Sequence, residues 1–444
     1  MKKRIFGETD GIRAEVGKSP LRPNIITELG RIIAEKQNAD GAGKFALGRD
    51  TRESGLWILD CMKQGLDSEH CVDYGVLPTP ALAVLIANGD YVGGVMATAS
   101  HNPFTDNGLK VFGADGDKIS DDEELAIEAD FFEHELEADI EPAAFDYNIE
   151  CSEVVLGQYI EIANRALDEG FGNHLVKGEI MLDSACGAGY IFSRKVFERY
   201  GIKVNQIDEK PNGQNINEGF GATHPEAIAE AAKKSGCIGV ALDGDADRII
   251  VADETGRIWN GDRIAVLLAE QLGATGVVLT EYSNLETINY LESKGIAVSK
   301  VVNGDRYVAE RCLEEGKKLG AELAGHILYM PWMKSSDGTF MALVIMKIME
   351  RAGKKLSELW ADYTEMPSKQ FGVKVREKKP LEEIPGYIEA VRDIQDELAG
   401  TGRVFVRYSG TENKLRILVE ARDEKKVDAC GEKLQKLIEK EIGA

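Results

Sequence analysis

Apolar strand-like runs alternate with helical patterns along most of the chain, and this alternation constrains the fold more than any other feature. In the first block, the runs 45–48 and 93–98 flank a helical stretch at 81–86. A second block begins with the strand-like run 179–183, and a third begins with 277–280. Strands that alternate with helices of this length are typical of α/β units with a largely parallel sheet. The sequence therefore predicts an α/β fold that is built from several such blocks.

Two composition changes divide the chain of 444 residues. A turn-rich segment at 141–146 follows the first block, and another change lies near 364–368. The residues after it end in a strand-like run at 415–419 and an amphipathic helical pattern at 425–442. At about 100 to 200 residues per domain, this length predicts roughly three domains, with two or four possible.

The charge balance narrows the possible partners. The chain has 76 Asp and Glu residues against 53 Lys and Arg, a net charge of −23. Nucleic acids and anionic membranes both bind basic surfaces, so neither partner is expected. No apolar run approaches the roughly 18 residues that a membrane-spanning helix needs. The seven cysteines are widely spaced without a C-x-x-C pair, which indicates neither a disulfide framework nor a zinc site and favours a cytoplasmic location.

Three carboxylates, Asp243, Asp245 and Asp247, alternate directly after an apolar strand-like run. In a loop, this spacing lets their oxygens converge on a hard dication such as Mg²⁺. A simple turn rich in Asp and Gly is the plain alternative. A calcium-binding EF-hand is another, since Glu254 falls at its twelfth position. However, Arg248 occupies the sixth position, where that loop needs glycine, and the flanking segments are strand-like, so we expect a magnesium site.

Ser100 follows another apolar run and is itself followed by His101. Because chemistry in α/β sheets gathers at strand ends, Ser100 is a candidate functional residue. A Ser/His hydrolase is one interpretation, but the chain has no G-x-S-x-G motif, and neighbours in sequence seldom form a catalytic pair. A capping serine before an Asn-Pro turn is the non-catalytic alternative.

The segment 407–413 combines a strand end with hydroxyl groups and glycine. Ser409, Gly410 and Thr411 offer hydroxyl and backbone donors, and Arg407 adds a planar guanidinium, so we expect a phosphate cradle there. The acidic chain repels anions as a whole, and an anionic substrate therefore requires a local basic pocket. Loops rich in glycine concentrate the candidates for that pocket, which are Arg13, Arg49, Arg52, Lys110, Arg248 and Arg407.

Five motifs resemble those of the α-D-phosphohexomutase superfamily, in the same order, and the resemblance covers nearly the whole chain. They are Phe6-Gly7 with Thr9-Asp10-Gly11-Ile12-Arg13, Gly48-Arg49-Asp50-Thr51-Arg52, Thr98-Ala99-Ser100-His101-Asn102-Pro103, Asp243-Gly244-Asp245-Ala246-Asp247-Arg248 and Ser409-Gly410-Thr411-Glu412. The resemblance implies three similar mixed-sheet α/β domains and a smaller C-terminal α+β domain around a central cleft. We accordingly predict domains at residues 1–146, 147–252, 253–365 and 366–444.

The resemblance also implies a set of site residues and cofactors. One Mg²⁺ would be bound by Ser100, Asp243, Asp245 and Asp247. The catalytic residues would be Ser100, Lys110, Arg13, His101 and His326, with Lys110 a candidate general acid or base. The substrate-binding residues would be Arg248, Asp305, Glu322, His326, Arg407, Ser409, Gly410, Thr411 and Arg416. Besides Mg²⁺, the implied cofactors are a phosphoryl group on Ser100 and a hexose 1,6-bisphosphate as activator or intermediate.

The implied activity is that of a phosphosugar mutase. Phosphorylated Ser100 would give its phosphoryl group to a small phosphosugar, and the opposite phosphate of the resulting bisphosphate would return to the serine. A non-catalytic phosphosugar-binding homologue and a metal-dependent phosphatase are the alternatives of a different class. The sequence leaves a monomer and a homodimer equally open.

The sugar is indicated by smaller fragments. The segments 75–80, 215–223 and 304–308 resemble the branch of the superfamily that converts glucosamine 6-phosphate to glucosamine 1-phosphate. The expected sugar-recognition loop, 321–326, departs from that pattern, because Ala324 stands where the family usually has serine. Glu8 is an additional departure in the N-terminal motif. Glucosamine phosphate is therefore the expected substrate, and a phosphomannomutase or phosphoglucomutase is the alternative.

Overall fold

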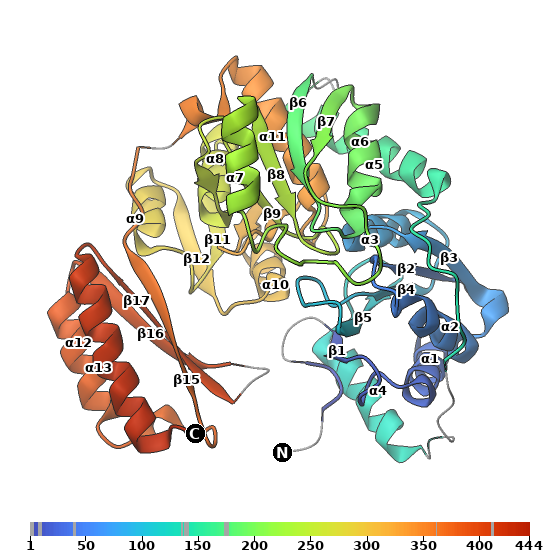
Figure 1. Ribbon diagram of the computed structural model, residues 1–444, viewed down its shortest axis with the longest axis horizontal. Helices are drawn as coiled ribbons and strands as arrows, with labels where there is room; N and C mark the ends of the chain where they lie inside the picture. The colour runs from blue at the N-terminus through green and yellow to red at the C-terminus, as the bar shows by residue number, and fades with distance from the viewer. Residues whose placement is uncertain are drawn as a thin grey trace.

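The computed structural model of the protein describes residues 4–7, 11–38, 41–134, 136, 142–172, 177–360, 362–409 and 413–444. The strands form four sheets that follow one another along the chain, and helices pack against each of them (Figure 1). Two sheets have five strands, the third has four, and the last has three. The predicted fold class, mixed α/β units followed by a smaller α+β unit, is confirmed.

The first three sheets share one topology. Strand orders are β1-β5-β4-β2-β3, β10-β9-β8-β6-β7 and β12-β11-β13-β14. In each sheet the central strands pair in parallel, and one of them, β4, β8 or β13, then pairs antiparallel with the strand that follows it. The expectation of largely parallel sheets is therefore wrong at this edge. The connections there are too short to hold a crossover helix, and short connections join antiparallel strands.

The first α/β unit has a completely buried β2 and β4 at the centre of its sheet. Such strands read as continuous apolar runs, which is why the sequence located them correctly. The elements of this unit are β1 (Ile12–Glu15), α1 (Pro23–Gln37), β2 (Phe45–Arg49), α2 (Gly55–Leu66), β3 (Cys71–Val76), α3 (Thr79–Asn88), β4 (Gly93–Ala97), β5 (Asp106–Gly113) and α4 (Asp121–Glu133).

The second and third units repeat this plan. The second contains α5 (Glu153–Phe171), β6 (Gly178–Asp183), α6 (Phe192–Arg199), β7 (Ile202–Gln206), α7 (Glu226–Ser235), β8 (Ile238–Leu242), β9 (Ile249–Ala252) and β10 (Ile258–Trp259). The third contains α8 (Gly261–Leu272), β11 (Gly276–Thr280), α9 (Leu285–Ser293), β12 (Ala297–Val301), α10 (Asp305–Glu315), β13 (Leu319–Ala321), β14 (Ile327–Tyr329) and α11 (Gly338–Ala352). The predicted domain limits stay predictions. We note that β10 belongs to the second sheet although it lies beyond residue 252.

The C-terminal unit is an antiparallel sheet, ordered β15-β17-β16, with two helices packed against it. Its elements are β15 (Ser368–Lys374), α12 (Tyr387–Leu398), β16 (Gly402–Tyr408), β17 (Lys414–Ala421) and α13 (Glu424–Ile442). Figure 1 places this unit at the far end of the chain, beside β12 and α9 of the third unit.

The apolar core distinguishes the C-terminal unit from the other three. A single buried cluster runs from Leu82 in α3 through Val240 in β8 to Leu279 in β11. The C-terminal sheet and helices enclose a separate cluster of their own, which includes Leu415 and Leu434. A further cluster, which includes Leu29 and Leu47, lies within the first unit alone. The first three units nevertheless share one apolar cluster, whereas the fourth contributes no residue to it.

Polar groups join the fourth unit to the third. Asn284, at the start of α9, donates to the carbonyl of Met366 at 3.0 Å and accepts from its backbone N–H at 3.0 Å. Glu420 in β17 accepts from the backbone of Leu285 at 3.3 Å and pairs with Arg403. Tyr282 of the third unit also packs edge-on against Phe405 in β16, with ring centroids 5.7 Å apart. A joint with few apolar contacts can rearrange with less loss of packing than a shared apolar core.

Gly65 provides a test of the packing between α1 and α2. A Cβ atom at this position would lie 2.1 Å from the carbonyl oxygen of Thr27 and 2.9 Å from the backbone nitrogen of Arg31. We therefore expect Gly65→Ala to lower the free energy of unfolding by about 1–3 kcal/mol, because backbone atoms must move apart. Urea denaturation followed by circular dichroism measures the change.

Gly157→Ala is the matched control, since Gly157 lies inside α5 with nothing within 4 Å of its added Cβ. This change should raise stability by about 0.5–1 kcal/mol, because alanine restricts the unfolded chain. Equal effects of the two substitutions would contradict the tight helix crossing.

Candidate active site

A cleft of about 940 Å³ brings together residues from all four sheet units. Among the described residues that line it, eight are Arg or Lys and five are Asp or Glu. The protein is therefore locally basic where the chain as a whole carries a charge of −23. The predicted site residues that line this cleft are Arg13, His101, Lys110, Arg248, Asp305, Glu322, His326, Arg407, Ser409 and Arg416. Gly410 and Thr411 lie outside the described residues.

The hairpin loops at the edges of the first three sheets carry the chemistry. Ser100 lies between β4 and β5, the three aspartates lie between β8 and β9, and Glu322 and His326 flank the turn between β13 and β14. Equivalent positions in three similar sheets thus supply a hydroxyl, a carboxylate cluster and a Glu–His pair. This common placement was not visible in the sequence, because short polar connections resemble any other turn.

The aspartate loop forms a compact acidic cluster. One carboxylate oxygen each from Asp243, Asp245 and Asp247 lies within 4.8 Å of the others, and all three residues are buried. No other group of three possible ligands occurs among the residues that the structure describes. The loop runs from one buried strand directly into another, so an EF-hand, which needs flanking helices, is excluded.

Lys110 in β5 is the cation that faces this cluster. Its buried ammonium group donates to Asp245 Oδ2 at 2.9 Å and to Asp247 Oδ2 at 2.7 Å. Burial acts to raise the pKa of Asp247, but Lys110 and then His326 outweigh it and hold that pKa well below its usual range. The lysine of the first unit is therefore paired with the acidic loop of the second.

The pKa of Asp243 is shifted in the opposite direction to that of Asp247. Burial, reinforced by the negative charges of Asp247 and Asp245, raises the pKa of Asp243 to about 7. In addition, Asp245 Oδ1 is buried and has no hydrogen-bond partner among the described residues. A buried carboxylate oxygen without a partner is unfavourable unless a cation or water reaches it. Oxygen ligands of this kind suit Mg²⁺, so these residues fit a divalent cation.

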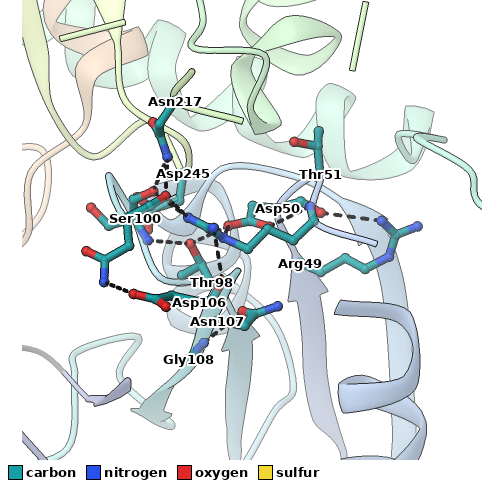
Figure 2. Close-up of polar contacts among 12 residues, drawn as sticks. Arg49, Asp50, Thr51, Thr98, Ser100, Asp106, Asn107, Gly108, Asn217 and Asp245 are labelled. Atoms are coloured by element: carbon teal, nitrogen blue, oxygen red, sulfur yellow. Dashed lines mark hydrogen bonds and ion pairs between the residues drawn. The ribbon is translucent and has the colours of Figure 1, made fainter. Parts of the chain in front are cut away.

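Ser100 lies directly against the acidic loop (Figure 2). Its hydroxyl donates to Asp243 Oδ2 at 2.7 Å, and the residue is buried. Its backbone has a φ of +50°, a left-handed conformation that is unusual for residues other than glycine. Gly244 permits the contact between the two loops, because a Cβ there would lie 2.6 Å from the Ser100 carbonyl oxygen.

His101 does not form a catalytic pair with Ser100. Its Nδ1 lies 3.3 Å from the serine oxygen, while the serine hydroxyl donates to Asp243 at a shorter distance. Burial, followed by the charges of Arg248 and Arg13, lowers the pKa of His101 to about 2. A neutral imidazole with so low a pKa is a weak proton acceptor, so the Ser/His hydrolase interpretation is not supported.

On the opposite side of the cleft, His326 connects the third unit to the aspartate loop. Its Nε2 lies 3.1 Å from Asp247 Oδ1, and its Nδ1 contacts Glu322 Oε2. Burial acts to lower the pKa of His326, but Asp247 and Glu322 raise it to about 10. Glu322 also accepts from the backbone of Gly304 at 2.7 Å, which fixes the segment that precedes Asp305. Ala324 is exposed on the same loop and lines the cleft.

Two arginines of the C-terminal sheet face each other at the far end. Arg407 and Arg416 are directly opposite in the register of β16 and β17. Like charges in this position repel each other unless an anion lies between or beside them. Arg407 is also held by Tyr282 of the third unit, whose hydroxyl accepts from its Nε at 2.7 Å. This arrangement can bind an anionic group away from the aspartate loop.

The sequence assigned two arginines to the pocket that the structure places elsewhere. Arg49 bonds to the carbonyl of Asn148 at 3.0 Å, and Arg52 is fully buried beneath the Ser100 loop. Conversely, the cleft includes Lys118 and Arg306, which were not predicted as site residues. Lys118 pairs with Asp305 at 2.8 Å across two units. The one sequence signal that Arg306 lines the cleft was its position directly after Asp305, in the segment 304–308.

Three α/β units and an α+β unit around one charged cleft, with a buried serine opposite a carboxylate loop, are the arrangement of an α-D-phosphohexomutase. Comparison with family models supports this class. Four models of the phosphoglucomutase/phosphomannomutase family match, namely alpha/beta/alpha domain I at residues 3–138, domain II at 170–256, domain III at 260–366 and the C-terminal domain at 372–437. The chain belongs to the phosphoglucomutase/phosphomannomutase family.

Relatives and solved structures agree with this assignment. The chain is 38% identical to a phosphoglucosamine mutase of Solibacter usitatus, with 100% of both chains covered, and 35% identical to one of Bdellovibrio bacteriovorus, with 99% of both covered. Among solved structures, a phosphoglucomutase/phosphomannomutase family protein from Burkholderia thailandensis superposes with a TM-score of 0.76 at 20% identity, covering 98% of this chain and 97% of the other. Aspergillus fumigatus N-acetylphosphoglucosamine mutase, in complex with GlcNAc-6P and magnesium, gives 0.68 at 19% identity, covering 100% and 96%. At these identities the structural likeness concerns the fold.

Among the described residues, no helix has both the length and the apolar character that are needed to span a lipid bilayer.

The acidic loop predicts metal binding that can be measured without substrate. We expect Mg²⁺ alone to bind the wild-type protein in isothermal titration calorimetry. Asp245→Asn should weaken this binding at least about tenfold, because it removes a charged ligand as well as the partner of Lys110. Glu254→Gln is the control, since Glu254 bonds to Ser357 instead of facing the cluster. Weaker binding only in Glu254→Gln would contradict the assignment.

Proposed function

We propose that this protein is a phosphosugar mutase that interconverts glucosamine 6-phosphate and glucosamine 1-phosphate. The observation that carries the proposal is the contact between Ser100 and Asp243, at 2.7 Å, beside a cleft lined by all four units. Phosphoryl transfer requires a fixed acceptor or donor oxygen and nearby positive charge, and this site supplies both. Relatives that are named phosphoglucosamine mutase over their whole length support the hexosamine substrate.

In the proposed reaction, phosphorylated Ser100 gives its phosphoryl group to a free hydroxyl of the sugar phosphate. The product is a hexosamine 1,6-bisphosphate, which turns around within the cleft. Its opposite phosphate then returns to Ser100, so that the enzyme is regenerated and the sugar is isomerised. One P–O bond forms and one breaks in each transfer, and no other reactant is consumed.

Different residues of the chain would carry out different parts of this reaction. Lys110 is the candidate acid or base for the sugar hydroxyl, and Arg13 and Arg248, which also line the cleft, are the candidates for neutralising the phosphoryl oxygens. Mg²⁺, when bound by Ser100 and the three aspartates, would supply further neutralisation of that group. Asp305, Glu322 and His326 are the candidates for binding sugar hydroxyls. Arg407, Ser409, Gly410, Thr411 and Arg416 are the candidates for holding the phosphate that is not being transferred.

A phosphomannomutase or phosphoglucomutase is the second candidate, and Ala324 favours it. This residue lines the cleft with a methyl group. A site that lacks one hydroxyl cannot hydrogen-bond a sugar substituent at that point, which changes discrimination among sugars. We further propose that the enzyme acts in the cytoplasm, in keeping with seven free cysteines, and works as a monomer or homodimer.

The decisive measurement is the conversion of glucosamine, glucose and mannose 6-phosphates to their 1-phosphates, with a hexose 1,6-bisphosphate as activator. We expect the highest kcat/KM for glucosamine phosphate. Ser100→Ala should lose all conversion while its melting temperature stays close to that of the wild type. Isotope-labelled bisphosphate should transfer its label to Ser100 in the intact protein.

Each contrary result removes a different part of the proposal. Faster conversion of mannose phosphate would reject the sugar but keep the mutase. Release of inorganic phosphate without isomerised sugar would favour a phosphatase. Phosphosugar binding without any conversion or labelling would favour a non-catalytic homologue.

A further inference from the structure

Two side chains from different units donate hydrogen bonds to the same two backbone carbonyl groups of the Ser100 loop. Arg52 donates through one terminal nitrogen to the carbonyl oxygens of Ser100 at 3.0 Å and Asn102 at 2.8 Å. Asn217, from the second unit, donates through Nδ2 to the same oxygens at 2.8 Å and 2.9 Å. Figure 2 shows the Asn217 side chain reaching toward Ser100 from the opposite side of the loop from Thr98. We call Arg52 and Asn217 the carbonyl clamp.

Arg52 is dedicated to this loop. Its side chain is fully buried and is absent from the described lining of the cleft. Besides the two clamped carbonyls, it bonds to those of Pro103 and Asp106 and to the Asp50 carboxylate. These bonds occupy all five guanidinium N–H groups. Arg52 therefore has no donor left for a substrate in the cleft.

Asp50, which pairs with Arg52, fixes the backbone nitrogen of Ser100 through Thr98. Asp50 accepts from the hydroxyl of Thr98 at 2.7 Å, and that hydroxyl accepts from the backbone N–H of Ser100 at 2.9 Å. The backbone nitrogen and carbonyl of Ser100 are thus both fixed. This explains how a serine persists at a φ of +50°, a conformation that the surrounding structure must impose.

Asn217 adds the second unit to the same contact. Its own φ is +60°, which asparagine tolerates better than most residues, and its backbone N–H donates to the carbonyl of Ala185 at 2.8 Å. The amide lies close to the aspartate loop, because a Cβ on Gly244 would be 3.0 Å from Asn217 Nδ2. The unit that presents the aspartates therefore also holds the backbone of the serine that faces them.

We propose that Arg52 and Asn217 are positioning residues that keep the Ser100 oxygen aimed at the aspartate loop during both phosphoryl transfers. The inference rests on the proposed function. Phosphorylation adds a charge of about −1.5 to −2 to Ser100, and the three adjacent carboxylates repel this charge to the extent that Lys110 and a bound cation do not compensate them. The sugar turns between the transfers, whereas the serine must return to one place. A clamp anchored in both units holds the loop against that repulsion, and it touches no substrate.

Asn217→Gly is the most specific test, because glycine retains the left-handed backbone and removes only the amide. We expect kcat for the preferred hexose phosphate to fall about 10- to 100-fold, since small displacements of a reacting group have effects of this size. KM should stay unchanged because the clamp does not contact the sugar. Amide hydrogen exchange in residues 98–106 of the full chain should become faster.

Gln214→Ala is the matched control. Gln214 reaches from the same loop of the second unit to Glu53 in the first, at 2.9 Å, without contacting the Ser100 loop. It should leave kcat, KM and the exchange of residues 98–106 as in the wild type. Arg52→Lys is a second test, since lysine retains the charge but has only three donors; it should slow kcat at least as much as Asn217→Gly.

A wild-type kcat in Asn217→Gly, or a rise in KM that accounts for the whole loss, overturns the proposal. Unchanged exchange of residues 98–106 overturns it as well. Amide hydrogen exchange can be measured whether or not the protein catalyses a reaction. If the wild-type protein isomerises no hexose phosphate, the proposed function fails by itself, and the exchange comparison still decides whether Asn217 holds the loop.

Discussion

The contact between a buried serine loop and a buried aspartate loop is the constraint on which the rest of this structure depends. Three carboxylates that lie within 4.8 Å of one another repel strongly where water is excluded. Lys110 compensates two of them through its contacts with Asp245 and Asp247, and Ser100 donates a hydrogen bond to Asp243. Lys110 and Ser100 come from the first unit, and all three carboxylates come from the second, while His326 of the third unit adds a contact to Asp247. Neither loop is therefore balanced without the other, which requires the two units to be fixed relative to each other.

The packing meets this requirement. One apolar cluster continues through the first three units, so the serine, the aspartates and the Glu322–His326 pair belong to one rigid body. The fourth unit encloses its own core and meets the third through the polar contacts of Asn284 and Glu420. The arrangement separates the two tasks of the proposed reaction. The rigid body holds the reacting phosphoryl group, and the separate unit offers Arg407 and Arg416 to the distant phosphate.

Much of the fold follows from local sequence signals. Runs 45–48, 179–183 and 277–280 lie inside β2, β6 and β11. β2 and β11 are buried throughout, and such strands leave an apolar run that needs no knowledge of their neighbours. The antiparallel edge strands β1 and β14 were missed because they are only four and three residues long, and because β1 pairs with β5, nearly a hundred positions away. The alternating aspartates and the serine after an apolar run were found because their chemistry is carried by adjacent positions.

Other parts of the site depend on contacts that no local pattern reveals. The sequence grouped Arg49 and Arg52 with the basic residues of the cleft because they lie shortly after a glycine, as several of the others do. In the structure, Arg49 bonds to Asn148 and Arg52 bonds to the Ser100 loop. Asn217 lies 117 positions from the serine that it contacts. Whether a guanidinium faces the cleft or the interior is decided by where carbonyl groups converge, and that is a property of the folded chain.

The placement of charge also explains why an acidic protein can receive an anion. The chain as a whole has a net charge of −23, whereas the cleft has eight basic and five acidic side chains among its described lining residues. Because walls of low dielectric focus the field, a phosphate near the opening responds mainly to the lining. Arg407 and Arg416 lie opposite each other at one end of the cleft, where they can receive an anionic group. Asp245, which does not line the cleft, has a buried oxygen that accepts no hydrogen bond among the described residues. The cleft thus offers cations to an anionic group, and the aspartate loop offers oxygen ligands to a cation. The proposed ligands, a phosphosugar and Mg²⁺, match these two arrangements.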